Sequence, residues 1–291
     1  MKPSPLGEVF GFPVDNTSTK AERFRNDRLC PFNNRVPSCT KDKATNPLGV
    51  CSIIHNDRYV ITCPIRFTED WLISADAAEF FFGTHSTWTS LREVRVNDVR
   101  GNSAGNIDYV LVEYDTDGII TDFGAVEVQG VYISGNIRTP FEQYMENRSQ
   151  PGSFSQENRS SLPSPDYLSS SRKRLIPQLL YKGGIFHSWK KKTAIVLQES
   201  FFATMPELPV VHVDAADMVW LLYDLVYIAE EDRYGLTLTR KVYTSFTEAM
   251  EIVSHPLHGE VEDFVQALQH KLDSSFGASP DAPILTDLPV E

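Results

Sequence analysis

The chain has 291 residues, which is long enough for one large domain or two small ones with a core. Its formal net charge is −12. Met1–Pro5 shows no basic-then-apolar signal pattern, and no run reaches the roughly 18 apolar residues of a membrane span. We therefore expect a cytoplasmic protein with no membrane partner. The negative charge is concentrated in Pro206–Glu291, which holds 16 acidic and four basic residues, so Met1–Met205 is neutral. A neutral region can still contain a cationic groove, and charge does not exclude a nucleic-acid partner.

All four cysteines lie within 34 residues, after an N-terminal arm (residues 1–28) with one expected helix at Thr19–Arg28. Clustered thiols in an intracellular chain favour metal binding over disulfides, and four thiolates suit Zn²⁺ or a single iron. Two disulfides or four buried thiols are the alternatives. A metal would make this loop-rich segment rigid, because metal binding is coupled to folding. The candidate structural ligands are Cys30, Cys39, Cys51 and Cys63.

A core-facing helix is expected in Glu69–Trp88, from apolar residues at helical spacing. A short strand at Glu93–Val96 and a Gly- and Asn-rich loop at Asn97–Asn106 follow. Two β-rich runs, Ile107–Tyr114 and Ile119–Ile133, then flank the dipeptide Asp117-Gly118, which is typical of a two-residue hairpin turn.

If Thr116 and Ile119 close that turn, the pairing places Asp108 directly opposite Glu127. Like charges at such a position repel each other, and a divalent cation is the simplest way to offset the repulsion. Gln129 should share the face of Glu127, whereas Val126 and Val128 should point into a core. A surface hairpin with scattered acids is the alternative, and a bulge at Gly124 would shift the register by one residue.

Two carboxylates and a polar group at this spacing suit Mg²⁺-assisted hydrolysis of a phosphodiester. Mg²⁺ is held through few protein oxygens, which leaves positions for water and a phosphate oxygen. Glu93 is a candidate third carboxylate, because its strand leads into the hairpin. A surface acid on an edge strand is the alternative for Glu93.

Downstream, residues 146–172 are rich in Ser, Pro and Asn and predict a long exposed loop. Arg172–Lys192 carries seven basic residues and no acidic residue, interleaved with apolar and aromatic side chains. Such a segment is typical of a surface that follows phosphates, although a solvated helix face has the same composition. Further elements are expected as strands at Ala194–Leu197, Met218–Ile228 and Leu236–Tyr243, helices at Ser245–Val253 and from about Glu260, and a disordered tail at 274–291.

Two blocks of the sequence resemble the NotI family of type II restriction endonucleases. The first runs from Phe24 to Arg66 and includes Cys30-Pro-Phe, Ser38-Cys39, Gly49-Val-Cys51 and Cys63-Pro-Ile-Arg66. The second contains Asp108 and Val126-Glu127-Val128-Gln129, which is similar to a Glu-x-Gln variant of the Glu-x-Lys element. Lys173–Leu197 is similar to the family's helix and strand after the core.

The resemblance implies an α/β (α+β) fold with a PD-(D/E)xK nuclease core: a mixed β-sheet flanked by helices, plus a small metal-binding module. The expected domains are 1–68 for the arm and cysteine module and 69–273 for the nuclease. It further implies a homodimer that uses Mg²⁺, bound by Asp108 and Glu127, to cleave double-stranded DNA at a GC-rich palindrome. Gln129 then replaces the usual lysine, Glu93 matches an additional acid, and the four cysteines hold one structural iron or zinc.

Two other functions fit the same residues. A catalytically inactive DNA-binding protein with a structural metal site would bind DNA without cutting it. A metal-stapled structural or interaction protein would have no nucleic-acid partner at all.

Overall fold

The computed structural model describes residues 4–43, 45–148, 162–255 and 259–275. The chain divides into two compact units, Met1–Ser254 and His255–Glu291. Every candidate site residue belongs to the first unit. In the second unit the structure describes the helix α9 (Val261–Ser275), as expected from its amphipathic pattern. No helix in the described ranges combines the length and apolar character needed to span a membrane.

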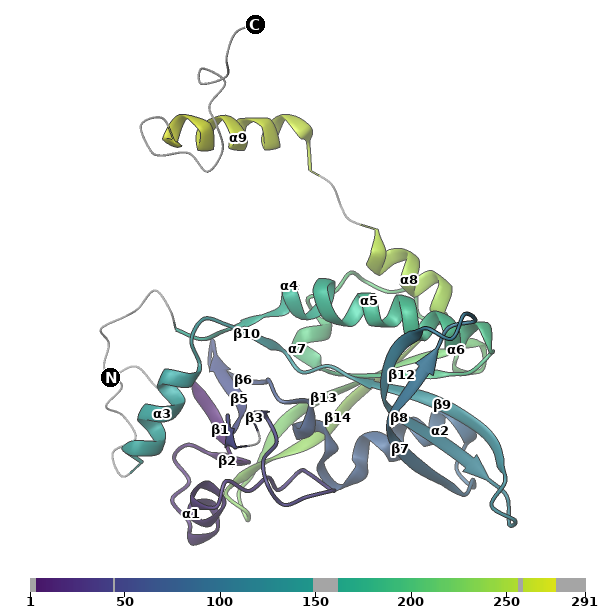
Figure 1. Cartoon of the computed structure of the whole chain (residues 1–291), viewed down its shortest axis with the longest axis horizontal. Helices are drawn as coiled ribbons and strands as arrows, with labels where there is room; N and C mark the ends of the chain where they lie inside the picture. Colours follow the sequence, from purple (N-terminus) through teal and green to yellow (C-terminus); the bar gives the residue numbers. More distant parts are fainter. Residues whose placement is uncertain (1–3, 44, 149–161, 256–258, 276–291) are drawn as a thin grey trace, which may run out of the picture. The chain divides into compact units, whose positions relative to one another are not determined.

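A six-stranded mixed sheet forms the centre of the first unit (Figure 1). The central strand β12 runs parallel to both of its neighbours, β9 and β13, and the remaining pairs are antiparallel. The three strands predicted in the C-terminal half are confirmed, β13 with the predicted bounds and β12 and β14 with wider ones. In sheet order the strands are β14 (Arg233–Thr244), β13 (Met218–Ile228), β12 (Thr193–Gln198), β9 (Ile120–Val128), β8 (Ser103–Tyr114) and β7 (Trp88–Asn97).

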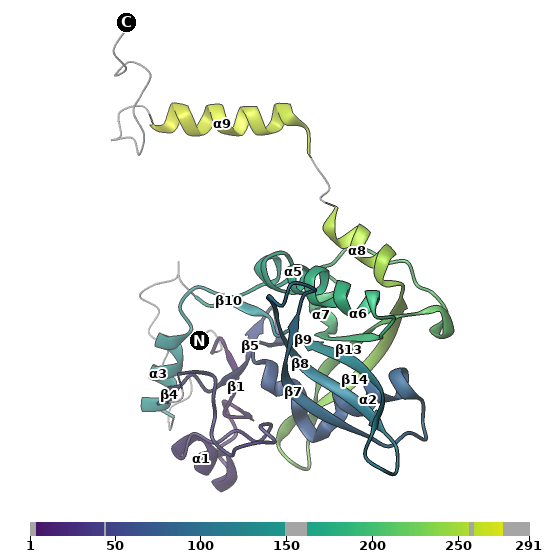
Figure 2. The same ribbon diagram turned by 45° about the vertical axis from the view of Figure 1, so that its right-hand side comes forward.

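Both faces of this sheet are covered. Side chains alternate along a strand, so the buried strand β12 packs apolar residues on each face. Ala194 and Val196 of β12 pack in the cluster that contains the helix α2, whereas Ile195 and Leu197 pack on the opposite side. A run of short helical segments covers that opposite side (Figures 1 and 2). These segments are α4 (Tyr167–Ser170), η3 (Ser171–Leu175), α5 (Ile176–Gln178), η4 (Leu179–Gly183) and α6 (Gly184–Ser188).

The helix predicted at Glu69–Trp88 is shorter than expected. It is α2 (Leu72–Phe82), preceded by a 3₁₀ segment, η1 (Pro64–Trp71). Asp70 and Trp71 have positive φ angles of 47° and 61°, which an α-helix does not accommodate. The helix packs closely on β9, where a Cβ at Gly124 would lie 2.5 Å from the Phe81 ring. Gly124 therefore permits close approach of the helix and is not a bulge.

The loop predicted at Asn97–Asn106 is also shorter, since β8 already begins at Ser103. The loop predicted at 146–172 is wrong beyond Leu162, where β11 (Ser164–Asp166) and α4 occur, while its central part lies outside the described residues. Residues 276–291 of the expected tail also lie outside them. The capping position before α8 (Phe246–Ser254) is confirmed, because Ser245 Oγ accepts the Glu248 N–H at 3.3 Å.

The N-terminal segment forms a second, smaller sheet with strand order β2-β1-β5-β6. Its apolar residues Leu6 and Ile53 belong to the same buried cluster as Leu197 of β12. Residues on both sides of the boundary predicted at residue 68 therefore share a buried cluster, and the boundary itself stays a prediction. The elements are β1 (Leu6–Val9), β2 (Phe12–Pro13), α1 (Thr19–Asn26), the ribbon β3 (Asp42–Lys43) and β4 (Asn46–Pro47), β5 (Val50–His55) and β6 (Arg58–Ile61).

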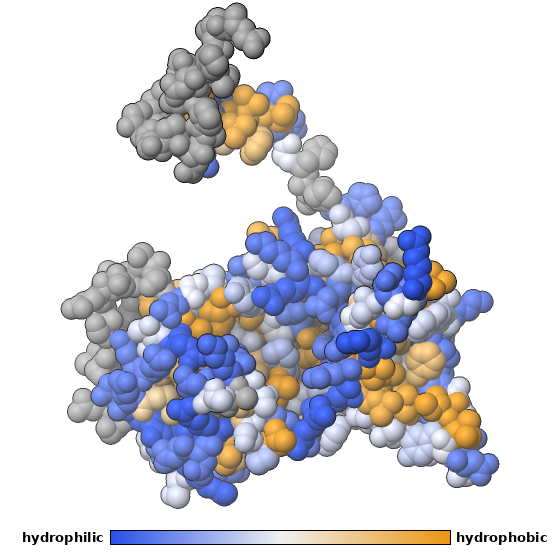
Figure 3. Space-filling view, in the orientation of Figure 1, coloured by the Kyte–Doolittle hydropathy of each residue, from blue (hydrophilic) through white to orange (hydrophobic). Residues whose placement is uncertain are grey.

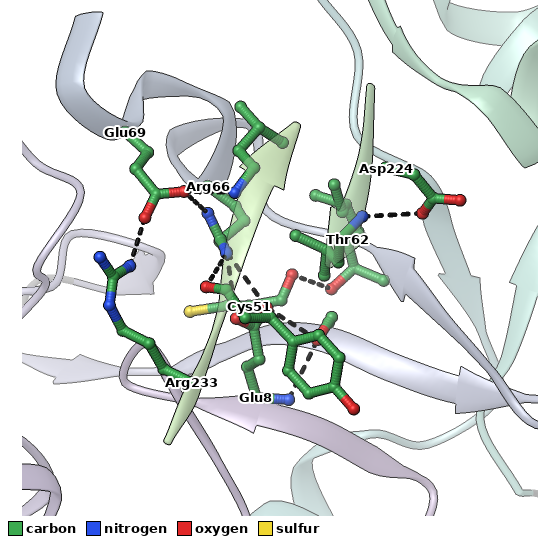
Figure 4. A network of polar contacts seen from close by, with 12 residues as sticks. Glu8, Cys51, Thr62, Arg66, Glu69, Asp224 and Arg233 are labelled. Carbon is green, nitrogen blue, oxygen red and sulfur yellow. Dashed lines mark hydrogen bonds and ion pairs between the residues drawn. The ribbon is translucent and has the colours of Figure 1, made fainter. Parts of the chain in front are cut away.

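A buried ionic network joins this smaller sheet to η1 and β14 (Figure 4). The Arg66 guanidinium is fully buried and contacts Glu8 at 3.1 Å and Glu69 at 2.8 Å. Glu69 also pairs with Arg233 and accepts the Leu236 N–H at 2.7 Å. Burial opposes ionisation of Glu69, but Arg66 and these hydrogen bonds outweigh it and lower its pKa. Burial dominates at Glu8, whose pKa is raised.

Other described elements complete the unit around these layers. They are β10 (Tyr132–Ser134), α3 (Arg138–Glu146), α7 (Glu199–Phe202) and η5 (Val213–Ala215). Tyr132 pairs with Asp166, so β10 and β11 form a two-stranded ribbon that leads into α4. This ribbon sets where the helical run α4–α6 begins.

Candidate active site

The hairpin of β8 and β9 has the predicted register, but a different turn produces it. Asp115 O accepts the Gly118 N–H at 3.0 Å, and Asp115 N–H reaches Ile119 O, so the turn has three residues instead of two. Gly118 has a φ of 78°, which only glycine adopts freely. A register shift beyond Tyr114 and Ile120 then restores the predicted pairing, which continues to Tyr109 opposite Val126. The next residues along this register are Asp108 and Glu127.

Asp108 and Glu127 contact each other directly. Their carboxyl groups lie close enough for each to shift the pKa of the other, and one Asp108 oxygen accepts the Val128 N–H at 2.9 Å. Glu127 is only 5% exposed. Burial raises the pKa of both carboxyl groups, and the neighbouring Asp108 adds to the effect at Glu127, whose pKa rises to about 8. The pair thus concentrates two acids at a place where two negative charges are unfavourable.

Glu93 joins this pair from the third strand. Arg92 pairs with Tyr109 and Val94 with Ile107, so the register places Glu93 beside Asp108. The Glu93 backbone has a φ of 53°, an uncommon conformation for a non-glycine residue within a strand. Burial is the main cause of the raised pKa of Asp108, and the negative charge of Glu93 adds a smaller increase. Three neighbouring strands therefore each bring one acid to the same site.

Lys182 approaches the acids from the helical side, and sequence reasoning did not single it out from the other basic residues of its segment. Its Nζ lies 2.8 Å from the Glu127 carboxylate, and it also donates to Asn106 O and Gln178 Oε1 at 2.8 Å each. The side chain is 5% exposed. Glu127 Oε1 is nevertheless buried without a hydrogen bond of good geometry. The helical segment η4 that carries Lys182 has π-type hydrogen bonding, which is frequent at functional sites.

Gln129 lies just beyond the end of β9 and turns away from the acids. Its Nε2 donates to the adjacent Gly130 O at 2.6 Å, and its N–H bonds to Val196 O. Among the described residues, no hydrogen bond links its side chain to Asp108 or Glu127. Val126 and Val128 point to the opposite face and are buried against the α2 cluster, as predicted.

Asp108 and Glu93 open onto a cleft shared with the cysteine-bearing loops, and Glu127 lies behind its wall next to Asp108. The cleft has a volume of about 400 Å³, and Asp108 and Glu93 form part of its wall. Asn33, Arg35 and Thr40, from the segment around the first two cysteines, form another part. A ligand in this cleft would touch both the strands that carry the acids and the loop between the first two cysteines.

The four cysteines are free thiols, and their backbones are joined in two pairs. Cys30 and Cys39 flank a loop closed by the bridge of Leu29 and Ser38, and the Cys63 N–H donates to Cys51 O at 3.2 Å. The Cys63 thiol is close enough to interact electrostatically with the other three. Burial raises the pKa of Cys30 to about 11 and raises those of Cys39 and Cys51 as well.

Backbone groups are directed at two of these thiols. The backbone N–H groups of Phe32 and Asn33 near Cys30, and of Lys41 near Cys39, lower the pKa of these thiols and so partly offset the effect of burial. Such groups stabilise the thiolate, which is the form that binds metals. Within the described ranges, no three Cys, His, Asp or Glu side chains stand at full metal-binding spacing. The donors are thus grouped without forming a complete coordination shell.

The basic segment forms the exposed side of the helical run over the acids. Arg172, Lys173 and Lys190 are exposed, and the Arg174 guanidinium lies over the Tyr132 ring. Lys191 is paired with Asp122. Figure 3 shows mainly hydrophilic side chains over α4–α6.

The sequence matches the family described as Restriction endonuclease NotI over residues 14–236. This range includes the four cysteines, the three acids, Lys182 and five of the six strands in full. No curated protein matches the chain significantly. Because the family match covers most of the chain, the protein belongs to the NotI restriction endonuclease family and is a DNA-binding, site-specific deoxyribonuclease.

Proposed function

We propose that this protein is a Mg²⁺-dependent type II restriction endonuclease with a PD-(D/E)xK nuclease core. The observation that carries the proposal is the contact between Asp108 and Glu127 across neighbouring strands, with Glu93 on the third. Family membership supplies the reaction, hydrolysis of duplex DNA, and this group of acids supplies a place for it.

The residues fit a hard divalent cation. Asp108 and Glu127 bring carboxylate oxygens to one place, and the Val128 N–H holds one Asp108 oxygen and orients that carboxylate. Carboxylate oxygens are the preferred ligands of Mg²⁺. When bound, Mg²⁺ activates a water and stabilises charge on the scissile phosphate. Asp108 and Glu127 would hold the ion, and Glu93 lies where it can orient a water in the cleft.

We also propose one structural iron or zinc at the four cysteines. Thiolates suit both metals, and backbone N–H groups near Cys30 and Cys39 partly offset the burial that raises the pKa of both thiols. Such an ion would fix the loop that carries Asn33 and Arg35 against the cleft. Its role would be to hold that loop, not to take part in hydrolysis.

The DNA face in this proposal is the cleft together with the basic side of α4–α6. Exposed Arg172 and Lys173 would contact phosphates, which fix the register of a protein on a duplex. A single centre cuts one strand, so cutting both strands of a palindrome calls for two centres related by a twofold axis. A homodimer acting on a GC-rich palindrome is therefore the form that we propose, on the strength of the family resemblance.

Plasmid digestion followed by run-off sequencing of the products tests this function. With Mg²⁺ we expect discrete fragments whose ends define one palindromic site. The Asp108→Asn variant serves as the control for contaminating nucleases and should give none. An absence of cutting with Mg²⁺ and with Mn²⁺ would refute the proposal.

A further inference from the structure

We propose that Lys182 is the positioning residue that supplies the positive charge of the nuclease centre, which Gln129 cannot supply. This inference rests on the function proposed above. An ammonium group has three N–H donors, and each has an acceptor here: Glu127, Asn106 O and Gln178 Oε1, all at 2.8 Å. The charged group is therefore held at one position beside the carboxylate.

The position of Lys182 depends on two special features of the backbone. Gly105 has a φ of 116°, which favours glycine, and the Lys182 side chain packs against it, since a Cβ there would make an ordinary contact at 3.4 Å. The π-type turn η4 changes the direction of the residues in the helical run, and Lys182 lies within it. The lysine thus reaches the acids from a helix 55 residues beyond Glu127.

The chemistry of Gln129 shows why a separate cation is needed. Its amide is uncharged, and it is hydrogen-bonded to Gly130 O instead of to the acids. Arg92 is another cation near this site, but its guanidinium lies over the rings of Trp71 and Tyr109. Lys182 makes the ion pair with Glu127. Charge fixed in advance beside a reacting phosphate stabilises the transition state more than the bound substrate.

A functional role and a merely structural one predict different results for Lys182→Met. The ammonium group lies against the Glu127 oxygens and repels a divalent cation there. Removing it should therefore tighten Mn²⁺ binding about threefold or more. The single-turnover cleavage rate at saturating Mg²⁺ should nevertheless fall about 100-fold or more, the effect typical of losing one preorganised charge-stabilising group. DNA affinity measured in Ca²⁺ should stay within about threefold, because the charge is buried.

Electron paramagnetic resonance follows Mn²⁺ binding to protein whose cysteine site already holds its metal. Quenched-flow assays follow cleavage. Lys241→Met is the control, since it removes a partly buried lysine that pairs with Asp76 and Glu79 and lies outside both the basic segment and the cleft. Its cleavage rate and Mn²⁺ affinity should stay within about threefold of the wild-type values. A parallel loss of Mn²⁺ affinity, cleavage and folded fraction in Lys182→Met would overturn the proposal in favour of a structural role.

The milder variant Gln178→Leu covers the case in which Lys182→Met does not fold. It removes one acceptor of the ammonium group and leaves the charge in place. We expect an approximately threefold to tenfold slower cleavage with unchanged DNA affinity, and an unchanged rate would count against the proposal. If wild-type protein and Lys182→Met cut equally while Asp108→Asn is inactive, only the role of Lys182 fails. If the wild type does not cut, the proposed function fails with it.

Discussion

Asp108 and Glu127 bring their carboxyl groups together from adjacent antiparallel strands, and Lys182 donates to the same Glu127 from the helical layer at 2.8 Å. The site is thus built by elements from three parts of the chain. Removing either carboxylate should abolish cleavage without unfolding the protein, since both are stabilised more as neutral groups than as charges.

We predict that Asp108→Asn and Glu127→Gln each lower the cleavage rate by about 10³-fold or more. Metal-assisted charge stabilisation is worth several kcal/mol, and each 1.36 kcal/mol is a factor of about ten. DNA affinity in Ca²⁺ and metal content at the cysteines should be retained. Glu113→Gln, on the same hairpin but away from the cleft, is the control. Unfolding of either variant would show that these residues serve the fold.

Glu93 tests whether backbone strain is retained for function. We predict that Glu93→Gln slows cleavage about 10-fold to 100-fold with little change in stability. Glu93→Gly should be at least as stable as the wild type, because glycine adopts the φ of 53° without the strain of about 1 kcal/mol that other residues incur. Its cleavage rate should be as low as that of Glu93→Gln. Urea denaturation and cleavage assays on the three proteins give the comparison, and a fully active Glu93→Gly would argue that the side chain is dispensable.

Loss of the cysteine-bound metal should destabilise the protein. We predict that Cys51→Ser and Cys63→Ser lose most of the bound metal and lower the thermal midpoint by about 5 °C or more, given about 2–4 °C for each kcal/mol in a domain of this size. Atomic emission identifies the metal, and a visible absorption spectrum separates iron from colourless zinc. Ser38→Ala, beside Cys39, is a control that keeps all four thiols. Full metal content and stability in both cysteine variants would refute a structural metal site.

The ionic network around Arg66 makes stability depend on pH in the acid range. The pKa of Glu69 is lower in the folded protein than its ordinary value of 4.5, so the unfolded chain binds the proton more readily. The stability from this carboxylate is therefore present above about pH 4.5 and lost as the pH falls through the lower folded pKa. Glu8, whose pKa is raised, has the opposite dependence: its contribution is greatest below about pH 4.5 and is lost at higher pH.

We predict that Glu69→Gln lowers stability at pH 7 by about 3 kcal/mol, because it leaves buried Arg66 with one partner fewer. Its loss of stability between about pH 5 and pH 3 should be smaller than that of the wild type. Glu142→Gln, which removes an exposed partner of Arg138, should follow the wild-type curve. Urea unfolding at several pH values provides the measurement, and parallel curves for the wild type and Glu69→Gln would contradict the assignment.

Arg172 and Lys173 test the proposed DNA face. Neutralising both to Ala should weaken binding to specific and non-specific DNA alike. The slope of log K for DNA binding against log salt concentration should become less steep by about 0.9 for each phosphate that the variant no longer neutralises. Lys20→Ala, an exposed lysine on α1, should leave the salt dependence unchanged. Fluorescence anisotropy at a series of salt concentrations measures both quantities, and an unchanged slope in the double variant would place the DNA on another surface.

The sequence by itself determined the secondary structure of the hairpin and its register. Counting from a two-residue turn closed by Thr116 and Ile119 predicted Asp108 opposite Glu127, and the register agrees although the turn itself was predicted wrongly. The turn was wrong because Asp115 accepts the backbone bond that was assigned to Thr116, and a register shift compensates for the extra residue. The register of a hairpin depends on the loop length together with any shift in the flanking strands, and here the two changes cancel.

Only the tertiary structure decided which polar groups meet. Gln129 has the right spacing in sequence but turns to Gly130 O, because β9 ends at Val128. Lys182 lies far from the acids in sequence and looked like one basic residue among seven, yet the packing of η4 against β8 places it on Glu127. Periodicity records which face of an element is apolar, whereas contacts between distant charged groups depend on how the layers pack.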